Sequence, residues 1–281
     1  IRQGAALLWP WISAVLLVTL VPHVGIVAVA IILGISPALD AVEGFARTMP
    51  TALNSAQRYF QIIDAPVAIA EPDEPKPLPK GPLKLRISRV PVSAKGTVSL
   101  EVAAGEHIGI IGSSGSGKST LAKLILKLAQ LRSGTITIGG VDIAEVSSAD
   151  LRKSVTLVEQ KSVLFRASVL ENLRMGNPEL SEDEAREASR LASISELPLD
   201  ADALRLSGGQ QQRLCLARAL ARTPQVLIVD EATSHQDALN QADLSQTLAT
   251  LKDTTVIIIA HRTAALAHVD RIIDLEEIKN P

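Results

Sequence analysis

The sequence predicts an α/β fold preceded by a transmembrane helical hairpin. Three observations lead to this interpretation. After residue 83, short apolar runs of strand length recur and several end in glycine-rich or polar loops. Patterns typical of helices alternate with these runs. Before them, residues 4–36 contain no Asp, Glu, Lys or Arg, which is typical of a segment that crosses a bilayer.

Composition divides the chain into three segments. Residues 1–63 are interpreted as part of a membrane domain, namely its last one or two helices. Pro22 and Gly25 interrupt the apolar run and favour a hairpin of residues 5–21 and 24–63. Residues 64–82 hold six of the fifteen prolines and predict a linker. Residues 83–281 are predicted to form the globular domain.

Basic residues orient the predicted hairpin. Arg2 precedes it and Arg47 and Arg58 follow it, whereas its turn carries no Lys or Arg. Because cytoplasmic flanks are enriched in Lys and Arg, both ends are predicted to be cytoplasmic. The chain begins with Ile1 and opens directly into apolar sequence, so we interpret it as incomplete at the N-terminus.

Charge and cysteine content exclude several classes of function. The net charge of -2 offers no broad basic surface, so no nucleic acid is expected as a partner. Cys215 is the only cysteine, which excludes an intrachain disulfide and a cysteine-based zinc cluster. It lies in an apolar helical stretch and is predicted to be a buried thiol without a function.

A glycine-rich loop follows the apolar run HIGII at residues 107–111 and precedes a helical pattern. The loop, GSSGSGKST, matches G-x-x-x-x-G-K-[ST], in which backbone amides and a helix N-terminus face phosphate groups. Lys118 is expected to neutralise the terminal phosphates, and Ser119 to ligate magnesium. The predicted nucleotide-binding residues are Gly112, Ser113, Ser114, Gly115, Ser116, Gly117, Lys118, Ser119 and Thr120.

An Asp-Glu pair ends another apolar run, residues 226–229. A carboxylate at the C-terminal end of a buried strand, close to a phosphate-binding loop, suits a magnesium site, and we assign this role to Asp230. Glu231 is then available to accept a proton from the water that attacks the terminal phosphate, or to hold that water in line.

The sequence LSGGQ at residues 206–210 runs into a helical pattern with an apolar stripe. Ser207 can cap this helix, while Gly208 and Gly209 allow backbone amides to approach an anion. Together with the motifs on either side, it makes residues 83–275 resemble the nucleotide-binding domain of ABC transporters. The resemblance implies a P-loop NTPase fold, with a mixed sheet core and a helical subdomain.

The resemblance also implies how the site works. Two domains sandwich ATP and Mg²⁺ head to tail, so that Ser207, Gly208, Gly209 and Gln210 meet the nucleotide held by a partner. Gln160 resembles the glutamine that contacts magnesium and water and relays nucleotide state to the membrane helices. His261 resembles the histidine that contacts the terminal phosphate, and Asp237 occupies the D-loop aspartate position.

This sequence departs from the family pattern in three places. The family carries an aromatic residue upstream of the P-loop that stacks on adenine, but residues 86–99 contain none, which puts the base preference in doubt. The segment before LSGGQ is short and lacks the usual Gly-Glu element. His235 and Gln236 replace the usual residues before Asp237. Both of these changes predict altered communication with the partner or membrane domain.

A membrane hairpin fused to the cassette resembles the end of an exporter subunit. The implied function is ATP hydrolysis coupled to transport, in an integral protein of the bacterial inner membrane with its nucleotide-binding domain in the cytoplasm. The implied partners are a second half-transporter, identical or paralogous, the lipid bilayer and a transported substrate. The sequence leaves open whether that substrate is a thiol, lipid, peptide or drug.

Two alternative functions fit the sequence less well. A non-transport ABC ATPase that acts as a clamp would lack the apolar lead-in of residues 4–36. A catalytically idle regulatory half is disfavoured because Lys118, Asp230, Glu231 and His261 are all present. ATPase activity compared with that of Glu231→Gln separates the idle half from an active one.

Overall fold

The computed structural model divides the chain into two units, residues 1–67 and 68–281, and each is described here by itself. The structure describes residues 11–13, 15, 16, 19, 25–65, 69–93, 96–159, 163–230, 246–260 and 266–280.

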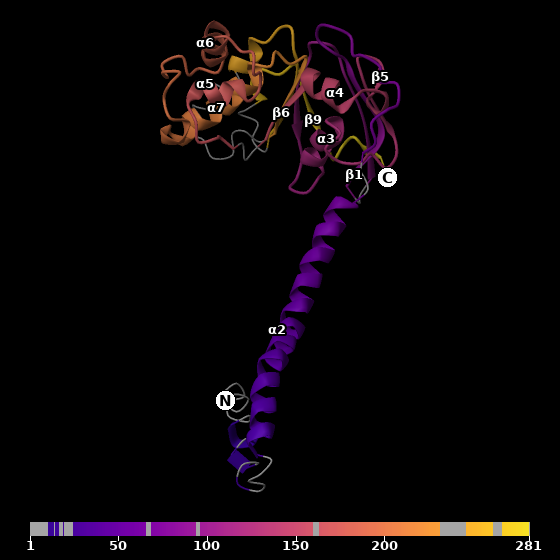
Figure 1. Cartoon of the computed structure of the whole chain (residues 1–281). Helices are drawn as coiled ribbons and strands as arrows, with labels where there is room; N and C mark the ends of the chain where they lie inside the picture. The colour runs from indigo at the N-terminus through magenta and orange to yellow at the C-terminus, as the bar shows by residue number, and fades with distance from the viewer. Residues whose placement is uncertain are drawn as a thin grey trace. The chain divides into compact units, whose positions relative to one another are not determined.

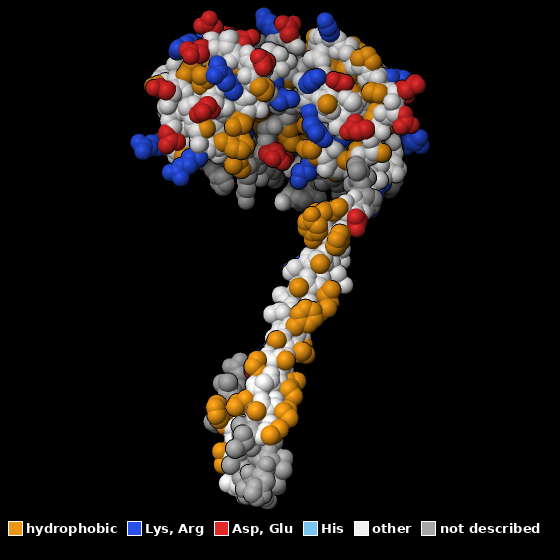
Figure 2. All heavy atoms as spheres, in the orientation of Figure 1, with side chains coloured by type: hydrophobic (Ala, Val, Ile, Leu, Met, Phe, Trp, Pro, Cys, Tyr) orange, Lys and Arg blue, Asp and Glu red, His pale blue; other side chains and the backbone are white. Residues whose placement is uncertain are grey.

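The first unit is dominated by one helix, α2, which spans Gly25–Ile63 (Figure 1). Its 39 residues continue through Pro37 and Pro50, and an ion pair of 2.5 Å joins Arg47 to Glu43 one turn earlier. Hydrophobic side chains are exposed along its whole length (Figure 2). The second limb of the predicted hairpin is therefore helical. None of the described helices combines the length with the apolar character that a membrane crossing requires.

A parallel sheet forms the centre of the second unit. Its strands lie in the order β6-β7-β8-β3-β9. They span Val155–Val158 (β6), Val226–Asp230 (β7), Thr255–Ile259 (β8), His107–Ile111 (β3) and Arg271–Asp274 (β9). The register pairs Val158 with Val229, and Asp230 with Ile259, so the strands end at one edge. This order brings together segments that are far apart in the sequence.

The two central strands β7 and β8 are buried at every residue, because both faces of the sheet are covered. Successive side chains of a strand point to opposite faces. Ile228 accordingly packs into one hydrophobic core, with α3 (Lys118–Ile125), and its neighbour Leu227 packs into the other, with α7 (Gly208–Leu220). The continuous apolar runs in the sequence are the direct result.

A second sheet completes the first core. It is antiparallel in its described pairings, with strand order β10-β2-β1-β4-β5. Its strands span Leu85–Ser93 (β1), Gly96–Val102 (β2), Thr135–Ile138 (β4), Val141–Asp142 (β5) and Lys279–Asn280 (β10). The helix α4 (Ser148–Ser154) follows the short 3-10 helix η1 (Ile143–Glu145). The predicted mixed α/β core is confirmed.

The second core lies under a helical lobe, which Figure 1 shows at the opposite end of this unit from β1 and β5. The lobe contains α5 (Val169–Arg174), α6 (Glu182–Leu191), the 3-10 helix η2 (Ala203–Arg205) and α7. Each of its three α-helices begins with a capping box, in which a serine and a Glu or Gln three residues later satisfy each other's backbone amides. The sequence predicted this helical subdomain from the resemblance.

Residues 69–82 of the proline-rich segment belong to the second unit and are hydrogen-bonded to other parts of it. The Glu71 carboxylate accepts the Ser148 backbone N–H at 2.8 Å, and hydrogen bonds from Ser148 lower the pKa of Glu71. Lys76 pairs with Glu145 at 2.7 Å. The Gln225 side chain donates to two carbonyls of the segment, at 2.8 and 2.7 Å. These contacts fasten the segment to η1, to the start of α4 and to the residue before β7.

Candidate nucleotide-binding site

The site is built at the carboxyl edge of the parallel sheet. In parallel sheets, ligands bind in the crevice outside the carboxyl ends of the strands. The strand β3 ends at Ile111 and leads into the glycine-rich loop, and β7 ends at Asp230. Only β8 separates these two strands. The strand order therefore brings the predicted phosphate loop and the predicted magnesium ligand to the same edge.

The phosphate loop depends on glycine for its shape. Gly112, Gly115 and Gly117 have φ values of 149°, 77° and 101°, in the region that side chains with a Cβ rarely adopt. At Gly117 space is also short, because a Cβ would lie 2.6 Å from the Val92 carbonyl oxygen. The end of β1 thus packs directly on the loop, which explains why the motif requires glycine before its lysine.

Lys118 is buried, with 4% of its surface exposed, and its ammonium group turns back onto the loop. Its Nζ donates to the carbonyl oxygens of Gly112 at 2.8 Å and Ser113 at 2.9 Å. Those bonds hold the charge where phosphate oxygens are expected, within reach of the amides of the loop. The hydroxyl of Ser116, also buried, has no hydrogen-bond partner among the described residues.

The N-terminus of α3 is open to an anion. Its N-cap is Gly117, which provides no side-chain hydrogen bond to the first turn. The first backbone N–H groups of a helix have no partner within the helix and carry a partial positive charge. Ser119 and Thr120 stand in this turn and are exposed. The chain therefore leaves donors available at the place where the predicted phosphates would bind.

Asp230 ends β7 and is 8% exposed. Together with the Ser119 hydroxyl it offers hard oxygen donors, the type that Mg²⁺ prefers. Across the described part of the chain, no group of three or more His, Cys, Asp or Glu residues could hold a metal ion. Magnesium takes one or two protein carboxylates and completes its shell with substrate phosphates and water.

Four predicted site residues, Gln160, Glu231, Asp237 and His261, lie outside the described residues. The sequence places three of them directly after the last described residues of β-strand segments. Gln160 follows Glu159 after β6, Glu231 follows Asp230, and His261 follows Ala260 after β8. Their roles stay predictions.

The LSGGQ segment leads into α7, and its Ser207 and Gly208 are exposed while the other three residues are partly buried. Ser207 is the N-cap: its hydroxyl accepts the Gln210 N–H at 3.3 Å, and the Gln210 side chain accepts the Ser207 N–H at 3.1 Å. A Cβ at Gly208 would meet nothing within 4 Å. Gln211, which the sequence reading did not single out, donates to the carbonyls of Leu204 and Leu206 and fixes the approach to the helix.

The short segment before LSGGQ is held by the start of α5. Val169 and Leu170 donate backbone N–H groups to the carbonyls of Ala201 and Leu199, each at 2.9 Å, and Ala203 donates to Ala167 at 3.1 Å. The segment that departs from the family pattern is therefore anchored inside the helical lobe.

Aromatic side chains are almost absent from residues 68–281, where Phe165 is the only Phe, Trp or Tyr. Phe165 lies beyond β6, which β7 and β8 separate from β3 and its loop. The residue that touches the phosphate loop from β1 is instead Val92. Stacking of the base on a Phe, Trp or Tyr ring of this unit therefore has no candidate near the loop.

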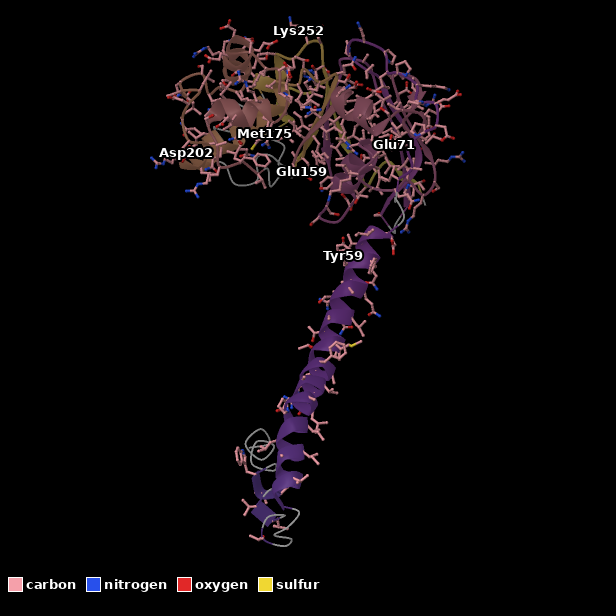
Figure 3. All side chains as sticks on the ribbon, in the orientation of Figure 1. Tyr59, Glu71, Glu159, Met175, Asp202 and Lys252 are labelled. Carbon is pink, nitrogen blue, oxygen red and sulfur yellow. The ribbon has the colours of Figure 1, made fainter. Side chains whose placement is uncertain are left out.

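Phe165 lines a groove of 520 Å³ between β6 and the helical lobe. Three other exposed apolar side chains, Leu128, Val163 and Met175, belong to the same groove. Its lining also includes Glu159, which is labelled in Figure 3 together with Met175. Cys215 lies at the groove as well and is buried, as predicted. No pattern in the sequence indicated this groove, because its residues come from five separate stretches of the chain.

Comparisons with known proteins agree with this site. A family profile described as ABC transporter matches residues 96–234. An ATP-dependent lipid A-core flippase of Desulfotalea psychrophila is 36% identical over 83% of this chain and 43% of its own length. The cyclolysin secretion/processing ATP-binding protein CyaB of Bordetella pertussis is 39% identical over 79% of this chain and 33% of its own length.

A solved structure extends the likeness to nearly the whole chain. The structure of a bacterial Atm1-family ABC exporter with ATP bound matches with a TM-score of 0.72 and 29% identity. It covers 97% of this chain, and this chain covers 52% of that one. The chain thus spans about half the length of the solved exporter, and less than half of the two relatives above.

Proposed function

We propose that this chain, which belongs to the ABC transporter family and is of the exporter type, binds and hydrolyses ATP and couples the reaction to export across a membrane. The observation that carries the proposal is the juxtaposition at one sheet edge of the glycine-shaped loop with its inward Lys118 and the buried Asp230. The relatives are named as a flippase, a secretion protein and an exporter.

The proposed mechanism begins with the triphosphate in the loop. Lys118 exchanges its bonds to the Gly112 and Ser113 carbonyls for phosphate oxygens, and the open N-terminus of α3 donates amides to the same group. Bound Mg²⁺, held by Ser119 and Asp230 with Gln160 nearby, would neutralise charge on the phosphates.

Hydrolysis follows by in-line attack of a water on the terminal phosphorus. Glu231 accepts a proton from the attacking water or orients it, and His261 contacts the terminal phosphate. A new bond forms between the water oxygen and phosphorus while the bond to the ADP oxygen breaks. The products are ADP and inorganic phosphate.

The second half of the site is proposed to come from another chain. The exposed start of α7 presents Ser207 and Gly208 outward, where a partner's phosphate loop can approach. We propose a homodimer or heterodimer of half-transporters that sandwiches two nucleotides head to tail. Closure on ATP and reopening after hydrolysis supply the movement.

Coupling to the membrane is proposed to use residues 1–63 and a larger membrane domain. The run without charged residues at 4–36 supports a membrane location, and a bacterial inner membrane with the cassette in the cytoplasm is our proposal.

The deciding experiment measures ATP binding and steady-state ATPase activity of the full chain together with its membrane partner. We expect the wild type to hydrolyse ATP, Lys118→Ala to lose binding, and Glu231→Gln to bind ATP while turnover falls at least a hundredfold. A wild type as inactive as Glu231→Gln, yet binding ATP, would support the idle regulatory half instead. The same measurements with GTP test whether the site distinguishes adenine from guanine although no aromatic ring is available to stack on the base.

A further inference from the structure

A carboxylate stands at the phosphate loop although the loop is expected to bind a polyanion. The Ser113 hydroxyl donates a hydrogen bond to Glu276 Oε1 at 2.5 Å. Both side chains are exposed. None of the motifs in the sequence includes Glu276, which is 163 residues away from Ser113 along the chain.

The fold fixes Glu276 in this place. The strand β9 pairs in parallel with β3, so Asp274 lies opposite Ile111 at the entrance to the loop. Leu275 is fully buried, and its N–H donates to the Ile111 carbonyl at 2.9 Å. The Glu276 N–H donates to the Asp274 carboxylate at 2.9 Å. These two hydrogen bonds hold Glu276 beside the loop.

The contact reaches the residues expected to hold phosphate. The carbonyl of Ser113 accepts a bond from Lys118 Nζ, and it also accepts the Ser116 N–H at 3.2 Å. Ser113 therefore contacts both charged groups: its carbonyl accepts from the Lys118 ammonium, and its hydroxyl donates to the Glu276 carboxylate. A triphosphate that enters the loop meets an attractive ammonium and a repulsive carboxylate.

We propose that Glu276 is a positioning residue that holds Ser113 and weakens the affinity of the loop for a nucleoside triphosphate. This inference rests on the proposed nucleotide-binding function. The carboxylate keeps the first turn of the loop in place without nucleotide, and its charge opposes the bound polyanion. Removal of the charge strengthens binding and slows release of ADP.

The test uses the full chain with its membrane partner and measures equilibrium binding of MgATP and MgADP. Glu276→Gln retains an oxygen that accepts the Ser113 hydroxyl but removes the charge. We expect the Kd for MgATP to fall about fivefold, because the variant removes the repulsion between two negative groups across a solvated gap. The effect should shrink near 1 M salt, where screening acts over about 3 Å.

Two control variants separate charge from structure. Glu276→Asp retains the charge and should keep a Kd close to that of the wild type. Glu277→Gln removes an exposed carboxylate from the same turn and should change the Kd less than Glu276→Gln does. A purely structural role predicts instead that Glu276→Gln leaves ATP affinity unchanged or weakens it.

The outcomes also separate this inference from the function on which it rests. Nucleotide binding that Lys118→Ala abolishes but Glu276→Gln does not strengthen would overturn the role of Glu276 alone. A wild type that binds no nucleotide in either salt condition would refute the nucleotide site itself. Tighter binding that persists unchanged at high salt would also contradict the charge argument.

Discussion

The helices α3 and α7 both begin at glycine-rich motifs, but their N-termini differ in whether a side chain caps the first backbone N–H groups. The α3 helix begins after Gly117, which contributes no side-chain cap, and its first residue, Lys118, is buried. The α7 helix begins after Ser207, whose capping box with Gln210 satisfies backbone amides within the same helix. The start of α3 keeps donors for a ligand, whereas the start of α7 is capped by its own side chains and leaves Ser207 and Gly208 exposed.

The difference indicates that the two motifs have different roles in binding the nucleotide. A loop that leaves its donors open can bind a polyanion within one chain. A capped, exposed helix start gains a ligand only when another surface is brought to it. The comparison therefore supports nucleotide binding by one copy and completion of the site by a partner.

The largest expected effect concerns the glycines of the phosphate loop. Gly117→Ala combines a strained φ with a contact of 2.6 Å to the Val92 carbonyl, so the loop must move. We expect ATP affinity to fall at least tenfold and stability to fall by about 1–3 kcal/mol. Gly115→Ala is the matched control, because its φ is 77° but its Cβ meets nothing within 4 Å. Equal losses of affinity in the two variants would refute the role of the Val92 contact.

The second prediction tests whether α7 acts on a partner. Ser207→Arg places a bulky cation at an exposed position. Combined with Glu231→Gln, it should prevent the dimer formation that ATP drives in Glu231→Gln alone. Binding of ATP to the loop should change less than twofold, since Ser207 lies in the helical lobe. Ser207→Ala removes only the cap and should cost about 1 kcal/mol of stability. Light scattering with and without MgATP measures the dimer, and simultaneous loss of binding would contradict the head-to-tail arrangement.

The smallest expected effect is a difference in pH dependence between the N-terminal caps of α6 and α7. Hydrogen bonds from the Ser181 backbone and hydroxyl lower the pKa of Glu184. Because the folded pKa lies below the unfolded one, this cap stabilises the protein above the unfolded pKa. That stability is lost as the pH falls through the folded pKa. The α7 cap uses Gln210, an amide that does not titrate in this range.

Urea unfolding at neutral and acidic pH measures this difference. Glu184→Gln should lower the unfolding midpoint at pH 7, and the gap to the wild type should close as the folded carboxyl becomes protonated. Gln210→Glu is the complementary variant and should make the α7 cap sensitive to acid. A gap for Glu184→Gln that stays constant with pH would show that the carboxylate charge has no part in the cap.

The sequence by itself determined the family and the elements that carry its motifs. The predicted α/β cassette and its membership in the exporter-type ABC transporters are confirmed. These motifs are local: a glycine at position 117, a lysine after it and a serine at a helix start prescribe backbone shape and donors within a few residues. The roles of the predicted site residues remain predictions.

Only the tertiary structure decided which distant residues meet at these motifs. The packing of Val92 on Gly117, the bond from Ser113 to Glu276 and the groove at Phe165 each join separate stretches of the chain. No spacing in the sequence encodes them, because they follow from the order of strands in the two sheets. Strand order is fixed by which apolar faces are buried together, a property of the whole fold rather than of a local segment.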